Sequence, residues 1–218
     1  MNSIPRFVIG LLFASAVLQS LNATAASFKL SADPKKTCSA IEITGEIIAG
    51  DYDRFVVVLK QAIALAPLRR LYLNSQGGQL LTAMAITEVI RNTAPTVETI
   101  VQPRHICNSA CNIILTVGSR HNVSKHAQLL IHQVFDEKTG KRDATQTKMI
   151  GQYLASNGMP PEIVSTMSKL KPKGLVAITP SNAKQLGFGS FNFYRSAEPP
   201  ATPQCSWKSI IPNGGPVR

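Results

Sequence analysis

Apolar residues recur along this chain with two different spacings, and their alternation predicts strands interleaved with helices. In Cys38–Ala49 apolar side chains occupy alternate positions, as expected of a half-buried strand or a hairpin. The spacing then becomes helical, with Phe55 and Leu59 on one face. Asp51 can cap this helix at its start, and Pro67 marks its end.

The same succession continues along most of the chain. Further strands are expected at Leu71–Leu73, Thr96–Val101, Arg120–Val123, Ala127–His132 and Phe191–Tyr194. Further helices are expected at Gln79–Asn92, Ser109–Val117, Thr147–Ser156, Pro161–Leu170 and Ser181–Leu186. Because strands that alternate with helices pair mostly in parallel, the pattern predicts an α/β domain.

The first residues depart from this pattern and are typical of a secretory signal peptide. Arg6 precedes an apolar run, Phe7–Leu18, which is shorter than the roughly 20 residues of a membrane-spanning helix. The sequence Ala23-Thr24-Ala25 then matches an A-x-A cleavage site. We expect a periplasmic or secreted bacterial protein, or alternatively one that an uncleaved N-terminus anchors to the membrane. The expected division is a signal peptide at 1–25, a domain at 26–196 and a proline-rich tail at 197–218.

Export changes the interpretation of the cysteines. Their number is four, and in an oxidising compartment an even number of cysteines can pair. Cys38 and Cys205 lie near the two ends of the exported chain. Cys107 and Cys111 are four residues apart, which on a helix would place their Cα atoms about 6 Å apart. We predict the disulfides Cys38–Cys205 and Cys107–Cys111, and four reduced thiols are the alternative.

The amino-acid composition indicates one domain and argues against some classes of binding partner. The chain has 218 residues, 44% of them hydrophobic, which suits one well-cored domain. Its formal net charge is +11, but the basic residues are dispersed and aromatic residues make up only 6%, so a nucleic-acid partner is not expected. His105, His121 and His126 are expected to be solvated loop residues, and their spacing is not that of metal ligands. No metal or cofactor is therefore expected.

Three short segments carry candidate chemistry: NSQGG at Asn74–Gly78, CNSAC at Cys107–Cys111 and LLIHQ at Leu129–Gln133. Paired glycines let the backbone turn and let an amide N–H point at a developing oxyanion. Ser109 stands before an apolar helix, where free N–H groups favour an anion. His132 ends an apolar strand and can accept a serine proton near pH 7.

Each segment also has a plainer interpretation when it is taken alone. Many glycine pairs only form turns, and Ser109 could simply cap the following helix, a role that serine prefers. His132 could be a hydrogen-bonded histidine of the core. The combination of the three segments is far more specific than any one of them.

From Leu71 to Val134 the chain resembles the proteolytic subunit of the Clp protease and its relatives in the ClpP/crotonase superfamily. Those proteins carry a Y-I-N-S-P-G-G type loop, a serine in an A-A-S-M-G type turn and a histidine in an M-I-H-Q-P type strand. The corresponding pieces here are LYLNSQGG, CNSAC and LIHQV, in the same order. Weaker similarity continues through Thr179–Ser190. The resemblance implies a repeated β-β-α spiral.

The resemblance also implies a serine peptidase. Ser109 would be the nucleophile and His132 the general base, and the backbone N–H groups of Gly78 and Ala110 would form the oxyanion hole. The substrate would be a peptide or an unfolded protein, and a homo-oligomer is possible within this family. An ATP-driven partner is not expected outside the cytoplasm, where there is no ATP pool.

The chain departs from the family at the third catalytic residue. Alignment of the segment at Thr179–Ser190 puts Leu175 where the family has an aspartate, and no acid occurs from Ile163 to Ser196. We expect a Ser–His dyad of weak activity, in which His132 is held by a backbone carbonyl or by another side chain. Candidates for that side chain are Asn182, Asp136 and Glu162.

Two other functions compete with this hypothesis. One is an inactive relative that binds peptides or assembles with partners in the cell envelope. The other is a crotonase-like acyl-CoA enzyme, which is disfavoured because CoA is cytosolic and that group does not need a Ser–His pair.

Overall fold

The protein is described by a computed structural model that covers residues 25–33, 35, 37–132, 134, 139, 141–156, 165, 169, 174–200 and 205. The predicted signal peptide lies outside the described residues except for Ala25. Most of the predicted helix Pro161–Leu170 and most of the tail also lie outside them. Within the described part of the chain, no helix is both long enough and apolar enough to cross a bilayer.

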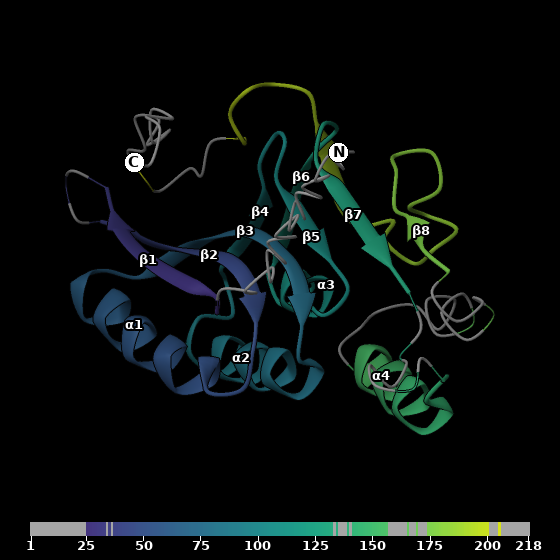
Figure 1. Ribbon diagram of the computed structural model, residues 1–218. Helices are drawn as coiled ribbons and strands as arrows, with labels where there is room; N and C mark the ends of the chain where they lie inside the picture. Colours follow the sequence, from purple (N-terminus) through teal and green to yellow (C-terminus); the bar gives the residue numbers. More distant parts are fainter. Residues whose placement is uncertain are drawn as a thin grey trace, which may run out of the picture.

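Nine strands and four helices are assigned within these residues (Figure 1). The strands are β1 Ser27–Ala32, β2 Ser39–Ile47, β3 Leu68–Gly78, β4 Glu98–Val101, β5 Ile106–Asn108, β6 Arg120–Ser124, β7 Gln128–Ile131, β8 Val176–Ala177 and β9 Phe191–Tyr194. The helices are α1 Asp51–Leu65, α2 Leu80–Thr93, α3 Cys111–Leu115 and α4 Ala144–Ser156. The predicted α/β domain is confirmed.

The strand order β8-β7-β5-β3-β4-β6-β9 shows how the chain winds into a spiral. Strand β2 pairs along one edge of β3, and along the other edge β3 pairs first with β4, at Arg70–Tyr72, and then with β5, at Ser75. Strand β6 extends the sheet from β4, and β7 extends it from β5. All of these neighbours pair in parallel, and β2 also pairs in parallel with β3. The strand β3 is therefore shared between two parts of the sheet, and its carboxyl end lies where they diverge.

The core forms where the apolar periodicities meet. Ile41 and Ile43 of β2 are paired with Leu71 and Leu73 of β3, and all four side chains are fully buried. Helices α1 and α2 lie side by side against this region and contribute Phe55 and other apolar residues to the same cluster (Figure 1). The apolar faces predicted from the sequence thus pack together in the core.

Several element boundaries differ from the predicted ones. The glycine pair of NSQGG was interpreted as a turn, but it continues β3 because β2 pairs with it through Gly78. Strand β1 was missed, since its short alternation is recognisable only through its antiparallel pairing with β2. Strand β5 occupies the end of the predicted turn Gln102–Asn108, and Ser181–Leu186 forms turns rather than a helix.

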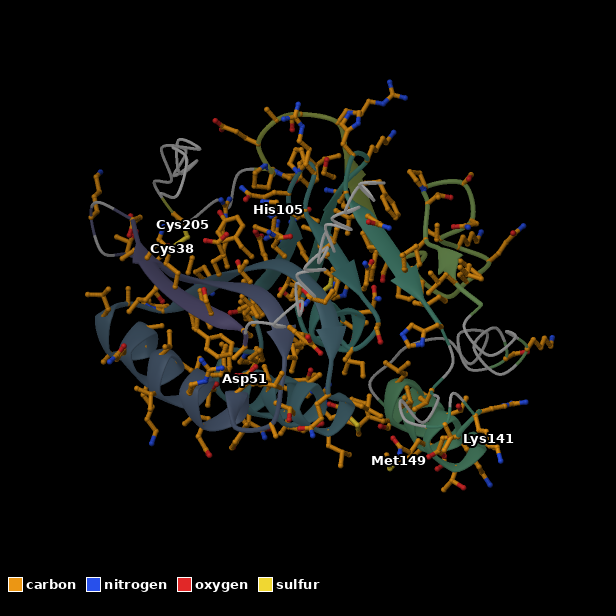
Figure 2. The ribbon with its side chains drawn as sticks, in the orientation of Figure 1. Cys38, Asp51, His105, Lys141, Met149 and Cys205 are labelled. Atoms are coloured by element: carbon orange, nitrogen blue, oxygen red, sulfur yellow. A yellow bond between two sulfur atoms is a disulfide. The ribbon has the colours of Figure 1, made fainter. Side chains whose placement is uncertain are left out.

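The first predicted disulfide, Cys38–Cys205, is present in the structure. It joins the residue before β2 to the tail across 167 residues of sequence, and Figure 2 shows the two side chains together at one edge of the molecule. A crosslink that encloses nearly the whole fold restricts the unfolded chain strongly. Cys205 is thereby fixed beside the start of β2.

Removal of this disulfide should destabilise the whole domain. We expect the double variant Cys38→Ala/Cys205→Ala to lose about 2–4 kcal/mol in the free energy of unfolding, because its loop is long. Urea unfolding followed by circular dichroism measures the loss. The matched control is Cys107→Ala/Cys111→Ala, which opens a loop of sequence separation 4 and should cost less. A larger loss in the control would contradict this account.

Candidate active site

Ser109 has an unusual backbone conformation for a residue with a side chain. Its φ is +52°, in the left-handed region that is uncommon outside glycine. It lies between β5 and α3, so the chain turns sharply from strand to helix at this serine. The helix cap is Ala110, and no side chain caps the helix. The simple role of Ser109 as a helix cap is therefore wrong, and α3 begins at Cys111 instead of at Ser109.

The second predicted disulfide brackets this turn. Cys107 lies on β5 and Cys111 begins α3, and their Cα atoms are 5.2 Å apart. Both pairings are thus present, although Cys107–Cys111 crosses a strand-to-helix turn and does not join two residues of one helix. Strained backbone at a functional position persists only where the surroundings hold it. The disulfide supplies such a restraint two residues before and after Ser109.

The side chain of Asn112 provides a second restraint. Its Nδ2 donates to the carbonyl of Leu130 over 2.8 Å and to that of Ser109 over 3.3 Å. The backbone N–H of Ser109 donates to the same Leu130 carbonyl over 2.9 Å. Asn112 is 5% exposed, so these bonds form away from solvent. The serine turn is therefore fixed to β7 just before the strand reaches His132.

His132 lies beside this turn because of strand pairing. Strand β7 runs parallel to β5, with Asn108 opposite Leu130, so each chain leaves the sheet next to the other. Ser109 and His132 are both partly buried, and both line one cavity of about 810 Å³. The cavity is also lined by Gly78 and Ala110. All four residues selected from the sequence thus meet in one place.

The end of β3 approaches the serine turn so closely that only glycine fits. A Cβ on Gly77 would lie 2.7 Å from Ser109 Cβ and 2.9 Å from the Ala110 nitrogen. A Cβ on Gly78 would lie 2.2 Å from the carbonyl oxygen of Ile47. Both glycines have positive φ, +95° and +130°. The lack of space and the positive φ angles together explain why both positions are glycine.

The two candidate oxyanion donors, the N–H groups of Gly78 and Ala110, belong to residues that line the same cavity. The N–H of Gln79 donates to Ile47 O over 2.7 Å, which holds the end of β3 to the end of β2. On the edge of β3 opposite β2 lies β5, with the serine turn beyond it. Among the described residues, the Ala110 N–H donates no hydrogen bond. The Ala110 amide is therefore available to bind an oxygen in the cavity.

The strand β8 runs beside the end of β7. It pairs antiparallel with β7, with Leu130 opposite Ala177 and Ile131 opposite Val176. If this register is continued by one residue beyond the paired strands, it sets Leu175 opposite His132. The side chain of Leu175 is 60% exposed. The alignment that assigned Leu175 to the aspartate position is therefore consistent with the strand register.

Of the side chains considered as alternatives for holding His132, only Asn182 is described. Its Oδ1 accepts from the Thr179 N–H over 2.7 Å, and its Nδ2 donates to Ala177 O over 2.8 Å. These bonds close the turn after β8. Asp136 and Glu162 lie outside the described residues.

Two other histidines differ from their expected environment. His121 lies on β6, with Nδ1 3.0 Å from Thr99 Oγ1 and its ring against Phe191, and burial lowers its pKa. Burial also lowers the pKa of His105. Both are therefore structural, partly buried residues, and only His126 is exposed as expected. Within the described residues no group of three metal-ligating side chains occurs.

Comparison with known proteins identifies the family. The family model for Clp protease matches residues 39–155, which include the serine turn and His132. The chain belongs to the Clp protease family. No curated protein sequence matches the chain significantly.

Solved structures of ClpP proteins show the same fold. ClpP1 from Listeria monocytogenes has a TM-score of 0.55 and 19% identity, over 72% of this chain and 92% of that one. An asparagine-to-aspartate mutant of the same ClpP1 has a TM-score of 0.54 and 20% identity, over 71% and 89%. The ClpP protease catalytic domain from Plasmodium falciparum has a TM-score of 0.53 and 21% identity, over 71% and 83%. The predicted ClpP/crotonase fold is confirmed.

Substitution of Gly77 tests the contact between β3 and the serine turn. We expect Gly77→Ala to slow covalent labelling of the protein by a fluorophosphonate at least roughly tenfold, because the new methyl group must displace Ser109 and disturb its turn. The control is Gly50→Ala, which has a similar φ of +88° but open space around the added Cβ. Both variants should lose stability from backbone strain, by roughly 1–3 kcal/mol. Equal labelling rates for the two would refute a specific role for Gly77.

Proposed function

We propose that this protein is an exported serine peptidase of the Clp protease family, with Ser109 as nucleophile and His132 as general base. The observation that supports this most strongly is the strained φ of Ser109 at a strand-to-helix turn, inside a cavity shared with His132. Strain of this kind is found at catalytic nucleophiles, where it exposes the reactive oxygen. The substrate class is a peptide or a partly unfolded protein.

The reaction would be acyl transfer to Ser109. His132 takes the Oγ proton while Oγ bonds to the carbonyl carbon, and the oxyanion accepts hydrogen bonds from the Gly78 and Ala110 amides. The tetrahedral intermediate expels the amine, which leaves with the proton from His132. Water then attacks the acyl ester, gives a proton to His132, and the acid product leaves as Oγ recovers that proton.

The proposed catalytic unit is a Ser–His dyad. The strand register, continued by one residue, sets Leu175 opposite His132, so this position offers no carboxylate to orient the imidazole or to stabilise its protonated form. In a triad, substitution of the acid lowers kcat by about 10⁴. We therefore propose slow turnover. The same observation supports a second candidate function, an inactive relative that retains the cavity for binding peptides in the envelope.

The proposed location is the periplasm or the exterior, after cleavage behind Ala25. Support comes from the N-terminal pattern and from the four cysteines, all of which form disulfides. A chain anchored by an uncleaved N-terminus is the alternative. No ATPase partner is proposed, and a homo-oligomer is possible because the family forms oligomers.

Substitution of the two catalytic candidates should abolish hydrolysis. We expect Ser109→Ala to remove all cleavage of activated esters and of unfolded casein above the uncatalysed rate. We expect His132→Gln to reduce kcat by at least about 10², since the proton acceptor is lost. Chromogenic ester hydrolysis and peptide mass spectrometry measure both. Hydrolysis that survives in Ser109→Ala would contradict the proposal.

A carboxylate introduced opposite His132 should increase activity. We expect Leu175→Asp to raise kcat of ester hydrolysis by roughly 10-fold or more, because an acid at this position can orient the ring and stabilise its cation. The matched control is Val57→Asp, which adds the same charge at a side chain of similar exposure, 56%, on α1. No gain in Leu175→Asp would show that His132 is already supported by a carboxylate or that the site is inactive.

A further inference from the structure

Ala26, the first residue after the proposed cleavage point, lies inside the fold beside a carboxylate. It is 0% exposed, and its backbone N–H donates to Asp51 Oδ2 over 3.3 Å. Asp51 is also 0% exposed. The pattern predicted Asp51 as a helix cap, but the cap is Gly50 and the carboxylate turns back toward the residues before α1. Figure 2 labels Asp51 at the end of α1 that follows β2.

The hydrogen-bond partners of the Asp51 carboxylate compensate its negative charge only in part. Arg54 pairs with Oδ1, and the Arg54 side chain is 49% exposed, so solvent weakens that interaction. Oδ2 receives two neutral amides, from Ala26 and, over 2.8 Å, from Ile48. A buried carboxylate is stabilised more by a charged donor than by a neutral one. Cleavage of the bond before Ala26 would turn one of these amides into an ammonium group.

The surrounding charges favour a cation at this position. Glu46 and Asp51, two of the twelve acids in the chain, lie at the end of β2 and at the start of α1. Glu46 pairs with Ala25 in an isolated bridge, which places it next to residue 26 in the structure. In a protein of formal charge +11, this corner is locally acidic. The cation in direct contact with Asp51 is Arg54, and its exposure lets solvent screen its repulsion of an added positive charge.

We propose that removal of residues 1–25 creates an ion pair between the α-ammonium of Ala26 and the buried carboxylate of Asp51, and that this pair fixes one wall of the candidate active site. The inference rests on the proposed export and cleavage. It assigns to Asp51 the role of a binding site for the processed terminus of its own chain.

The connection to the active site is short. The carboxylate that would bind Ala26 also accepts from the N–H of Ile48, and Ile48 and Ala49 line the cavity. The adjoining carbonyl of Ile47 accepts from Gln79, the residue after Gly78. An ion pair at Ala26 would therefore restrain the turn between β2 and α1, and through it the end of β3 that carries the proposed oxyanion donor Gly78. The unprocessed chain, with a neutral amide at residue 26, would hold this wall less firmly.

The test compares two N-termini in three proteins. A chain that begins at Ala26 and one that begins at Thr24 are prepared as wild type, as Asp51→Asn and as Asp53→Asn, and their thermal unfolding midpoints are measured. We expect the Thr24 form to unfold roughly 2–8 °C lower in the wild type and in Asp53→Asn, the exposed control on the same helical turn. In Asp51→Asn the two forms should unfold together.

Two further measurements make the outcome decisive. Nα-acetylation of the chain that begins at Ala26 removes the charge without adding residues, so it should unfold with the Thr24 form. N-terminal sequencing of the exported protein should give Ala26. Equal midpoints for the two wild-type forms, an unchanged difference in Asp51→Asn, or a different mature terminus would each overturn the proposal. Since unfolding needs no turnover, this result does not depend on whether Ser109 is catalytic.

Discussion

The close approach of the glycine end of β3 to the turn at Ser109 is the constraint on which the site depends. At Gly77 there is no space for even one methyl group between the strand and the Ser109 side chain. This contact brings the glycine end of β3 next to the Ala110 nitrogen, where we propose that the Gly78 and Ala110 amides form an oxyanion hole. The turn keeps its left-handed backbone because a disulfide and the Asn112 side chain hold it on both sides.

The spiral order of the strands explains why this contact forms at all. Since β5 pairs with the carboxyl half of β3 and β7 pairs with β5, the carboxyl ends of three parallel strands meet at one cavity. Each strand then brings a different candidate group: a backbone amide from β3, the proposed nucleophile from the turn after β5 and the proposed base after β7. The serine and the histidine are 23 residues apart in sequence, and strand register alone places them together.

The core could be predicted from the sequence because apolar spacing identified the faces of α1 and α2. The three motifs selected Ser109, His132 and Gly78 as candidate site residues, and these line one cavity. Strand β1 and the burial of Asp51 depend on long-range pairing, so local spacing could not reveal them. The start of α3 was misplaced because a left-handed residue at Ser109 cannot belong to the helix.

A serine that its surroundings activate reacts covalently with electrophiles that ordinary serines resist, and we propose that Ser109 is such a nucleophile. The folded, oxidised protein is treated with a fluorophosphonate probe, digested and mapped by mass spectrometry. We expect one adduct, on the peptide that carries Ser109, and we expect it to disappear when the protein is unfolded before treatment. Absence of any adduct on Ser109 in the folded protein, or equal labelling of surface serines, would contradict this proposal and would favour a protein that only binds peptides.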